Sequence, residues 1–86
     1  MLKYYTYLIK MSDGYVYTGQ TNGLRKRIKE HQDGKCPLTK NRGKIVSLYY
    51  EIFSDRKNAA KREKEIKGWR RSKKEKLMKN NKLVSI

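Results

Sequence analysis

Two short runs rich in tyrosine and β-branched residues stand near the start of the chain, on either side of Ser12-Asp13-Gly14. Residues 4–10 and 15–19 have the composition of β-strands, and the Asp-Gly pair between them is a strong signal for a tight hairpin turn. Side chains alternate between the two faces of a strand, so Tyr7 and Tyr17 meet on one face if the register allows. This segment therefore predicts an antiparallel sheet that presents a pair of tyrosines.

A helix of about residues 23–33 follows the hairpin. We expect Thr21 or Asn22 to cap its N-terminus and Gly34 to end it. Residues three, four and seven positions apart share one helix face, which gives an inward stripe of Leu24, Arg27, Ile28 and His31. Burying an unpaired guanidinium is costly, so Arg27 should lie at the edge of the core and face a carboxylate of the protein or a phosphate.

The rest of the sequence predicts one more strand and two more helices. The expected elements are an exposed, cation-rich loop at 35–44, a strand at 45–53, a helix from 56 to about 69 capped by Ser54 or Asp55, a helix from 72 to about 78 capped by Ser72, and a tail whose Leu83, Val84 and Ile86 can pack back. Together they indicate an α+β fold, with a small three-stranded antiparallel sheet flanked by helices, in one domain spanning residues 1–86.

Positive charge dominates the composition, because 23 lysines and arginines stand against 8 acidic residues, a formal net charge of +15. Self-repulsion of this size destabilises a compact domain and points to a polyanionic partner. Nucleic acid is favoured over an anionic membrane surface, because no predicted helix has a broad apolar face. Lys3 and Lys10 interrupt the N-terminal apolar run, which argues against a signal peptide or a transmembrane segment. The single cysteine, Cys36, cannot form an internal disulfide, so we expect a cytoplasmic protein.

One carboxylate stands out in the basic segment 56–76, which holds eleven cations and three acids. In the predicted helix, Glu63 has two alanines and an isoleucine as neighbours on the core-facing side, whereas Glu65 lies among cations as an ordinary surface acid. A carboxylate on such a stripe needs a positive partner, which is either Arg27 or a metal ion.

Each of these signals also has a purely structural interpretation. Paired tyrosines on a small sheet usually pack against each other, a histidine on a helix face is often a hydrogen-bonded edge residue, and basic helices are usually solvated. Together, however, the signals place two hydroxyls, a cation, an imidazole and a carboxylate around one corner. These are the groups that phosphodiester chemistry requires.

In these motifs the chain resembles the GIY-YIG nuclease superfamily, and in particular its compact single-domain subgroup. Tyr5-Thr6-Tyr7 stands at the place of the first motif and Tyr17-Thr18-Gly19 at the place of the second. The similarity continues through Arg27 and His31 in the family's helix pattern, the metal-binding glutamate position at Glu63, and the segments 38–43, 48–51 and 65–69. Tyr5 replaces the first glycine and threonines replace both isoleucines, departures that concern packing more than chemistry.

The resemblance implies a divalent-metal-dependent endonuclease that hydrolyses phosphodiester bonds in DNA, with Tyr7, Tyr17, Arg27, His31 and Glu63 as its catalytic residues. One convincing carboxylate favours a one-metal site, with Mg²⁺ or Mn²⁺ bound by Glu63. Arg27 would neutralise the charge that develops on phosphorus, and Tyr7 or Tyr17 would orient or deprotonate the attacking water. His31 would position a tyrosine or the phosphate. The alternative is a non-catalytic, basic nucleic-acid-binding module on the same scaffold.

Overall fold

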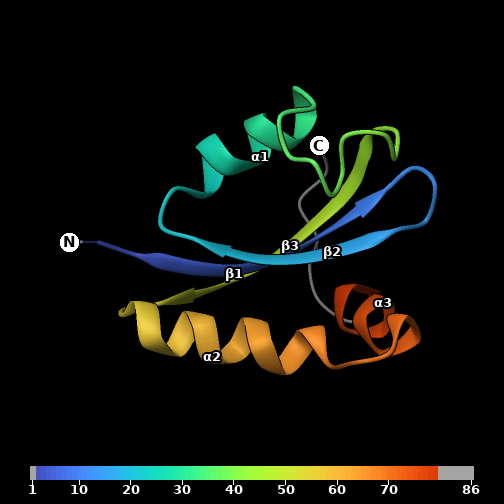
Figure 1. The fold of residues 1–86 in the computed structure, drawn as a ribbon. Coiled ribbons are helices and arrows are strands. Elements are labelled where there is room, and N and C mark those ends of the chain that lie inside the picture. The colour runs from blue at the N-terminus through green and yellow to red at the C-terminus, as the bar shows by residue number, and fades with distance from the viewer. Residues whose placement is uncertain (1, 80–86) are drawn as a thin grey trace.

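The structure, a computed structural model, describes residues 2–79 and contains the three-stranded antiparallel sheet and the flanking helices that the sequence predicts. The elements in chain order are β1 (Tyr4–Met11), β2 (Val16–Thr21), α1 (Leu24–Gln32), β3 (Ile45–Phe53), α2 (Arg56–Lys67) and α3 (Arg71–Lys79). The strand order is β2-β1-β3, so the first strand is central and β2 and β3 form the two edges (Figure 1). The fold belongs to the α+β class.

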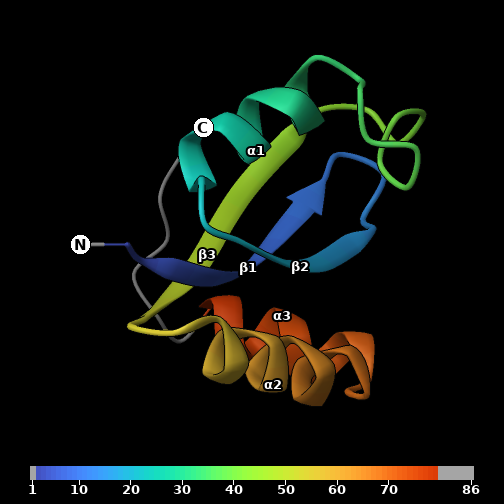
Figure 2. The ribbon, with the colours of Figure 1, turned by 60° about the vertical axis from the view of Figure 1, so that its left-hand side comes forward.

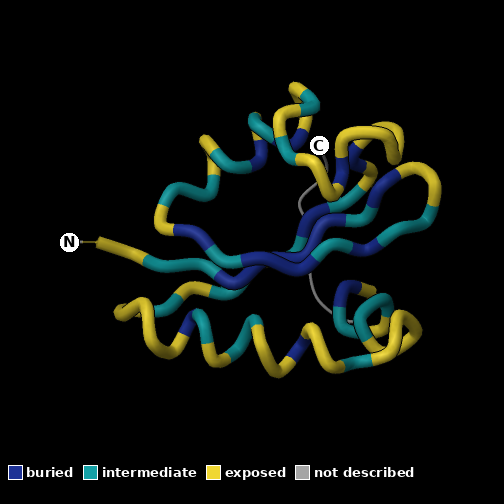
Figure 3. Tube along the Cα trace, viewed as in Figure 1, coloured by how far each residue is buried: buried dark blue, intermediate teal, exposed yellow. Residues whose placement is uncertain are grey.

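Helices cover both faces of the sheet. α1 lies over one face, and α2 and α3 lie over the other, as two viewing directions show (Figures 1 and 2). The central strand is consequently buried on both sides, and Tyr7, Leu8 and Ile9 each have 0% of their surface exposed (Figure 3). Burial on both faces explains why apolar and aromatic side chains follow one another here instead of alternating with polar ones.

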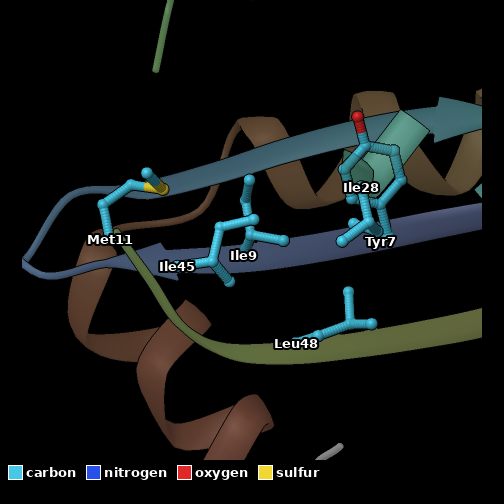
Figure 4. Close-up of a cluster of buried hydrophobic side chains, with 6 residues drawn as sticks. All are labelled: Tyr7, Ile9, Met11, Ile28, Ile45 and Leu48. Atoms are coloured by element: carbon cyan, nitrogen blue, oxygen red, sulfur yellow. The ribbon is translucent and has the colours of Figure 1, made fainter. Parts of the chain in front are cut away.

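The two faces have different cores. Under α2 and α3 the core consists of aliphatic side chains and a methionine, namely Leu8, Val16, Ile66 and Met78. Under α1 it consists of the side chains drawn in Figure 4, namely Tyr7, Ile9, Met11, Ile28, Ile45 and Leu48. The α1 face therefore holds a fully buried phenol among its aliphatic side chains.

Two glycines end their elements as predicted. Gly14 closes the hairpin turn with a φ of +95°, a backbone conformation that glycine tolerates best, and the Asp13 side chain accepts a hydrogen bond from the Tyr15 N–H at 2.9 Å. Gly34 follows the end of α1 with a φ of +73°. Local sequence therefore determines both the hairpin and the length of the first helix.

Two of the predicted helix caps are wrong. α1 begins after Gly23 and has no side-chain cap, because the Thr21 hydroxyl accepts a hydrogen bond from the Gly23 N–H (3.0 Å) instead of from the first helical turn. α3 begins at Arg71, so Ser72 lies inside the helix. The cap of α2 is confirmed, since the Asp55 side chain accepts a hydrogen bond of 2.7 Å from a backbone N–H of the first turn.

The other boundaries lie within two residues of the predicted ones, and β3 matches its prediction at both ends. The largest differences are at the end of β2, which continues to Thr21, and at the end of α2, which stops at Lys67. The expected packing of Leu83, Val84 and Ile86 falls outside the described residues. Within residues 2–79, the helices are too short and too polar for any of them to span a membrane.

Candidate active site

Two tyrosines of the hairpin lie against each other on the α1 side of the sheet. In the observed register Tyr7 is opposite Gly19 and Tyr17 is opposite Ile9, so the two tyrosines are diagonal neighbours with ring centroids 6.1 Å apart. Gly19 leaves the space that the rings need, because a Cβ atom there would lie 2.7 Å from Tyr7 and 2.9 Å from Tyr17. The predicted meeting of the tyrosines is confirmed, and the glycine between them permits it.

His31 of α1 completes this aromatic group and joins it to a chain of hydrogen bonds. Its ring centroid lies 5.9 Å from that of Tyr7 and 5.1 Å from that of Tyr17. The Tyr7 hydroxyl lies 3.0 Å from His31 Nε2, and Thr39 Oγ1 lies 2.8 Å from His31 Nδ1. The Thr39 hydroxyl donates in turn to the backbone carbonyl of Cys36 at 3.5 Å.

The groups that can donate a hydrogen determine the direction of this series of hydrogen bonds. Because Thr39 directs its hydroxyl hydrogen to the Cys36 carbonyl, its oxygen accepts from the Nδ1–H of His31. A neutral imidazole that donates through Nδ1 accepts through Nε2, so the Tyr7 hydroxyl donates to His31. The hydrogen bonds therefore run one way, from Tyr7 through His31 to Thr39.

Burial sets the charge states of Tyr7 and His31. Burial, and after it the neighbouring Tyr17, raises the pKa of Tyr7 far above its usual value, although the positive charge of Arg27 acts in the opposite direction. Burial, and after it the same arginine, lowers the pKa of His31. Both side chains are therefore neutral at pH 7, in agreement with the direction of the hydrogen bonds.

The amino-acid sequence does not single out Thr39 as a functional residue. The prediction of an exposed loop at 35–44 is wrong at this position, because only 1% of the Thr39 surface is exposed. Hydrogen bonds of 2.7 and 2.9 Å between Ser12 and Lys44 fasten the far end of the loop to the hairpin turn. The similarity of segment 38–43 to the compact nuclease subgroup is the signal that could have drawn attention to it.

Arg27 lies at the edge of the core, as predicted, with 38% of its side-chain surface exposed. Its carboxylate partner is Glu30, one turn further along α1 at 3.2 Å. The guanidinium also lines a small cleft of about 140 Å³, whose other described lining residues are Tyr4, Gln20, Thr21, Asn22 and Arg56. Two arginines and no described acidic side chain line the cleft, so it is suited to an anion.

Glu63 lies on α2, across the sheet from the tyrosine cluster (Figure 1). Its cationic partner is Lys67, one helical turn further on at 3.1 Å, so the first of the two predicted alternatives, an ion pair with Arg27, is wrong. The physical reason is that the sheet separates α1 from α2. Within residues 2–79, Glu63 forms no hydrogen bond or ion pair with the cluster of Tyr7, Tyr17, Arg27 and His31.

Glu63 is largely buried on α2, with only 19% of its side-chain surface exposed. The preceding residue, Arg62, reaches over β3, where it donates to both carboxylate oxygens of Glu51 at 2.9 and 3.1 Å. Glu51 is therefore neutralised by an arginine, whereas the partner of Glu63 is a lysine that is 53% exposed.

The carboxylate of Glu63 is the kind of oxygen ligand that a hard divalent cation prefers. Among residues 2–79, no three His, Cys, Asp or Glu side chains gather into a metal site. Mg²⁺ is commonly held by one or two carboxylates, with waters and phosphate oxygens completing its shell. On the α2 side of β2, the buried Thr18 hydroxyl has no hydrogen-bond partner in the described part of the chain. Glu63 would hold the metal, and the Thr18 hydroxyl lies on the face of the sheet that α2 covers.

Comparisons with known proteins agree with this architecture. A UPF0213 protein of Staphylococcus saprophyticus is 42% identical over 79 residues, which cover 91% of this chain and 96% of that protein. One from Clostridium perfringens is 40% identical over 83 residues, which cover 95% of this chain and 81% of that protein. The solution NMR structure of a UPF0213 protein of Bacillus halodurans shares 34% identity and a TM-score of 0.54, covering 93% of this chain and 86% of that one.

The family model described as the GIY-YIG catalytic domain matches residues 3–76. This range contains both tyrosine motifs of the hairpin, the arginine and histidine of α1, and the glutamate of α2. The fold, the motif positions and the extent of the match lead to one conclusion: the chain belongs to the GIY-YIG family of catalytic domains.

Proposed function

We propose that this protein is an endonuclease that hydrolyses phosphodiester bonds in DNA with the help of a divalent metal ion. The observation that carries the proposal is the cleft at the edge of the sheet that is lined by Arg27 of α1 and Arg56 of α2. The helix α1 also contributes His31 to the tyrosine cluster. A phosphodiester is an anion, and its hydrolysis adds charge to the phosphoryl oxygens. Two guanidinium groups without an acidic neighbour in the cleft are suited to bind it and to stabilise that charge.

Tyr17 is the tyrosine better placed to orient the attacking water. Tyr7 is fully buried and donates its hydroxyl hydrogen to His31, so water does not reach it. Tyr17 is partly exposed and forms no hydrogen bond within residues 2–79, so its hydroxyl is available to a water molecule. Tyr7 and His31 are then positioning residues, which hold the Tyr17 ring by contact from two sides.

The remaining chemical roles fall to Arg27, on the α1 side of the sheet, and to Glu63, on the α2 side. Arg27 would neutralise the phosphoryl oxygens while a bond forms between the water oxygen and phosphorus and the bond to the leaving oxygen breaks. Glu63 would hold the metal ion, with Lys67, whose side chain is 53% exposed, moving into solvent. When bound, the ion would stabilise the negative charge on the leaving oxygen.

The basic surface supports nucleic acid as the partner. The chain has a net charge of +15, and α2, α3 and their connection hold all eleven cations of segment 56–76. Such a surface binds phosphates largely without regard to base sequence, and the logarithm of the binding constant should fall by roughly 0.9 per contacted phosphate for each unit of log salt on duplex DNA.

The deciding experiment is a cleavage assay on supercoiled plasmid and on duplex, flap, junction and single-stranded oligonucleotides, with Mg²⁺, Mn²⁺ or EDTA. We expect nicking that requires the metal. Tyr17→Phe should lower the cleavage rate more than Tyr7→Phe, because only Tyr17 contacts the water. Salt-dependent binding without cleavage on any substrate would instead support the alternative function, a non-catalytic nucleic-acid-binding module.

A further inference from the structure

A larger hollow lies on the other side of α1 from the arginine cleft. It is a groove of about 730 Å³ between α1 and the part of the sheet formed by β1 and β3. α1 is a helix of only 9 residues, and its buried Ile28 packs against Tyr7 and also lines the groove. None of the groups in the arginine cleft lines this groove.

The floor of the groove is aromatic and apolar. Tyr5 of β1 and Tyr50 of β3 meet edge to face, with ring centroids 5.9 Å apart and an interplanar angle of 71°. Tyr50 is 38% exposed and the neighbouring Ile52 is 53% exposed, so the floor is accessible to solvent. An edge-to-face pair leaves ring surface on which a planar group can stack.

The rim of the groove is positively charged. Lys3, Arg25 and Lys29 line it, and no acidic side chain of the described residues does. An unpaired polynucleotide strand complements this combination, because its bases stack on aromatic rings while its phosphates face the cations. A DNA duplex keeps its bases stacked inside the helix and offers only its phosphates.

We infer that this groove binds an unpaired segment of DNA beside the bond to be cleaved. The inference rests on the proposed function and specifies its substrate class as DNA in which a single strand adjoins the scissile position. Both hollows are lined by the first half of α1, since Leu24 and Arg25 line the groove and Arg27 lines the arginine cleft. A strand bound in the groove and a phosphate bound in the cleft would therefore contact the same short helix.

The test measures binding in EDTA, where metal-dependent cleavage is stopped. The probes are a fluorescently labelled oligothymidine and a blunt hairpin duplex with the same number of phosphates. Tyr50→Ala should weaken oligothymidine binding by about five-fold or more and leave duplex binding unchanged. Tyr50→Phe, which keeps the ring, should bind as the wild type does. Thermal melts of both variants establish that they are folded.

Two double variants, each of which removes two cations, distinguish DNA binding in the groove from DNA binding to the general basic surface. Arg25→Ala with Lys29→Ala removes two cations from the rim, and Lys61→Ala with Lys64→Ala removes two exposed cations from α2, across the sheet. The first pair should raise the ratio of the oligothymidine to the duplex dissociation constant. The second pair should leave that ratio unchanged.

Four results would overturn the inference. The first is binding of oligothymidine by Tyr50→Ala at wild-type affinity, and the second is an equal loss of single-strand and duplex binding in that variant. The third is tighter binding of oligouridine than of oligothymidine by the wild type. The fourth is a dimer of this chain that the Tyr50→Ala substitution dissociates without affecting oligothymidine binding. The first two, together with normal metal-dependent plasmid nicking, would leave the proposed function intact. A wild-type protein that neither binds nor cleaves nucleic acid would overturn both.

Discussion

The two faces of the sheet bury different chemistry. Under α2 and α3 the buried groups are aliphatic, and Leu8 and Ile66 have no exposed surface. Under α1 they include Tyr7, His31 and Thr39, which hydrogen bonds connect in series. Apolar packing is non-directional, whereas buried polar groups must find partners in one geometry. We infer that the α2 and α3 face supplies chiefly stability and that the α1 face chiefly fixes the positions of functional groups.

Two buried threonines, Thr6 and Thr18, depart from this division. Thr6 faces α2, and its buried hydroxyl donates to the carbonyl oxygen of Ala59 at 2.7 Å. The hydrogen bond fastens the start of α2 to the central strand. The threonine that stands in place of the motif isoleucine at position 6 therefore has a structural role, which it fulfils with a hydrogen bond as well as by packing.

Arg27→Ala should have the largest effect on activity, because it removes a proposed functional group from the α1 face. Losing a group that stabilises transition-state charge typically lowers turnover by about 10²–10³. The melting temperature should change little, because the ion pair with Glu30 is more than one-third exposed. Plasmid nicking and thermal melts measure both effects. Lys26→Ala, an exposed cation of the same helix, is the control, and equal losses of activity in the two variants would contradict the role assigned to Arg27.

Glu63→Gln tests whether function is confined to the α1 face, because it removes a proposed functional group from the α2 side. Nicking should be lost, while stability should fall by only about 0.3–0.5 kcal/mol, the usual contribution of an i,i+4 pair such as the one with Lys67. Glu65→Gln is the matched control and should leave nicking unchanged. Normal nicking by Glu63→Gln would refute the one-metal mechanism. Nicking lost only together with the fold would make Glu63 a structural residue.

Ile66→Ala tests the stability role of the face under α2 and α3. Removing this fully buried side chain should lower the free energy of unfolding by about 2–5 kcal/mol. Cleavage per folded molecule should stay at the wild-type level, because no group of the proposed site is altered. Val46→Ala, at a position 50% exposed, should cost far less. Denaturant titration gives the stabilities, and reduced turnover of the folded Ile66→Ala protein would show that the faces are coupled.

Gly19→Ala places a methyl group between the two tyrosines. The nearest ring atoms are 2.7 Å from the new carbon, so the rings must shift, at a cost of about 1–3 kcal/mol in unfolding free energy. Displacement of Tyr17 should also lower nicking. Gly23→Ala is the control, because its Cβ would lie 4.0 Å from the closest side-chain atom. Similar melting temperatures for the two variants would show that the packing around Gly19 is loose.

The smallest expected effect is a pH dependence of stability due to His31, the single histidine of the chain. Its pKa in the folded protein is lowered from the usual 6.5, so below about pH 6.5 the unfolded chain binds a proton that the folded protein does not. Stability should therefore fall as the pH decreases from 6.5 toward the folded pKa, and should not respond to His31 above 6.5. Melts of the wild type and of His31→Gln test this, since the difference between them should shrink on acidification. A constant difference would contradict the neutral, buried imidazole.

What the sequence predicts well is local. Strand alternation and the Asp13-Gly14 turn predict the hairpin, and helical spacing predicts the inward positions of Ile28 and His31. Both signals depend on neighbouring residues, which the sequence displays directly. They account for the sheet, the helices and the tyrosine pair.

What the sequence does not predict depends on contacts between distant segments or on competition among nearby partners. Thr39 reaches His31 only because a loop folds back. Glu63 and Arg27 each pair with an oppositely charged residue one turn away in their own helix, and a residue so close is favoured over one across the sheet. The groove under α1 arises from a surface that no element of residues 2–79 fills, and such a gap has no sequence signature.

The hydrogen bond between His31 and Thr39 also divides the connecting segment into parts that should tolerate insertions differently. Lengthening a surface loop normally costs little, about 0.6 kcal/mol for each doubling. Between His31 and Thr39, however, an added residue would move the hydroxyl away from the imidazole that it orients. Beyond Thr39, residues 40–42 are exposed before the chain is fastened again at Lys44. A peptide tag inserted there should leave the imidazole in place, whereas the same tag a few positions earlier should release it.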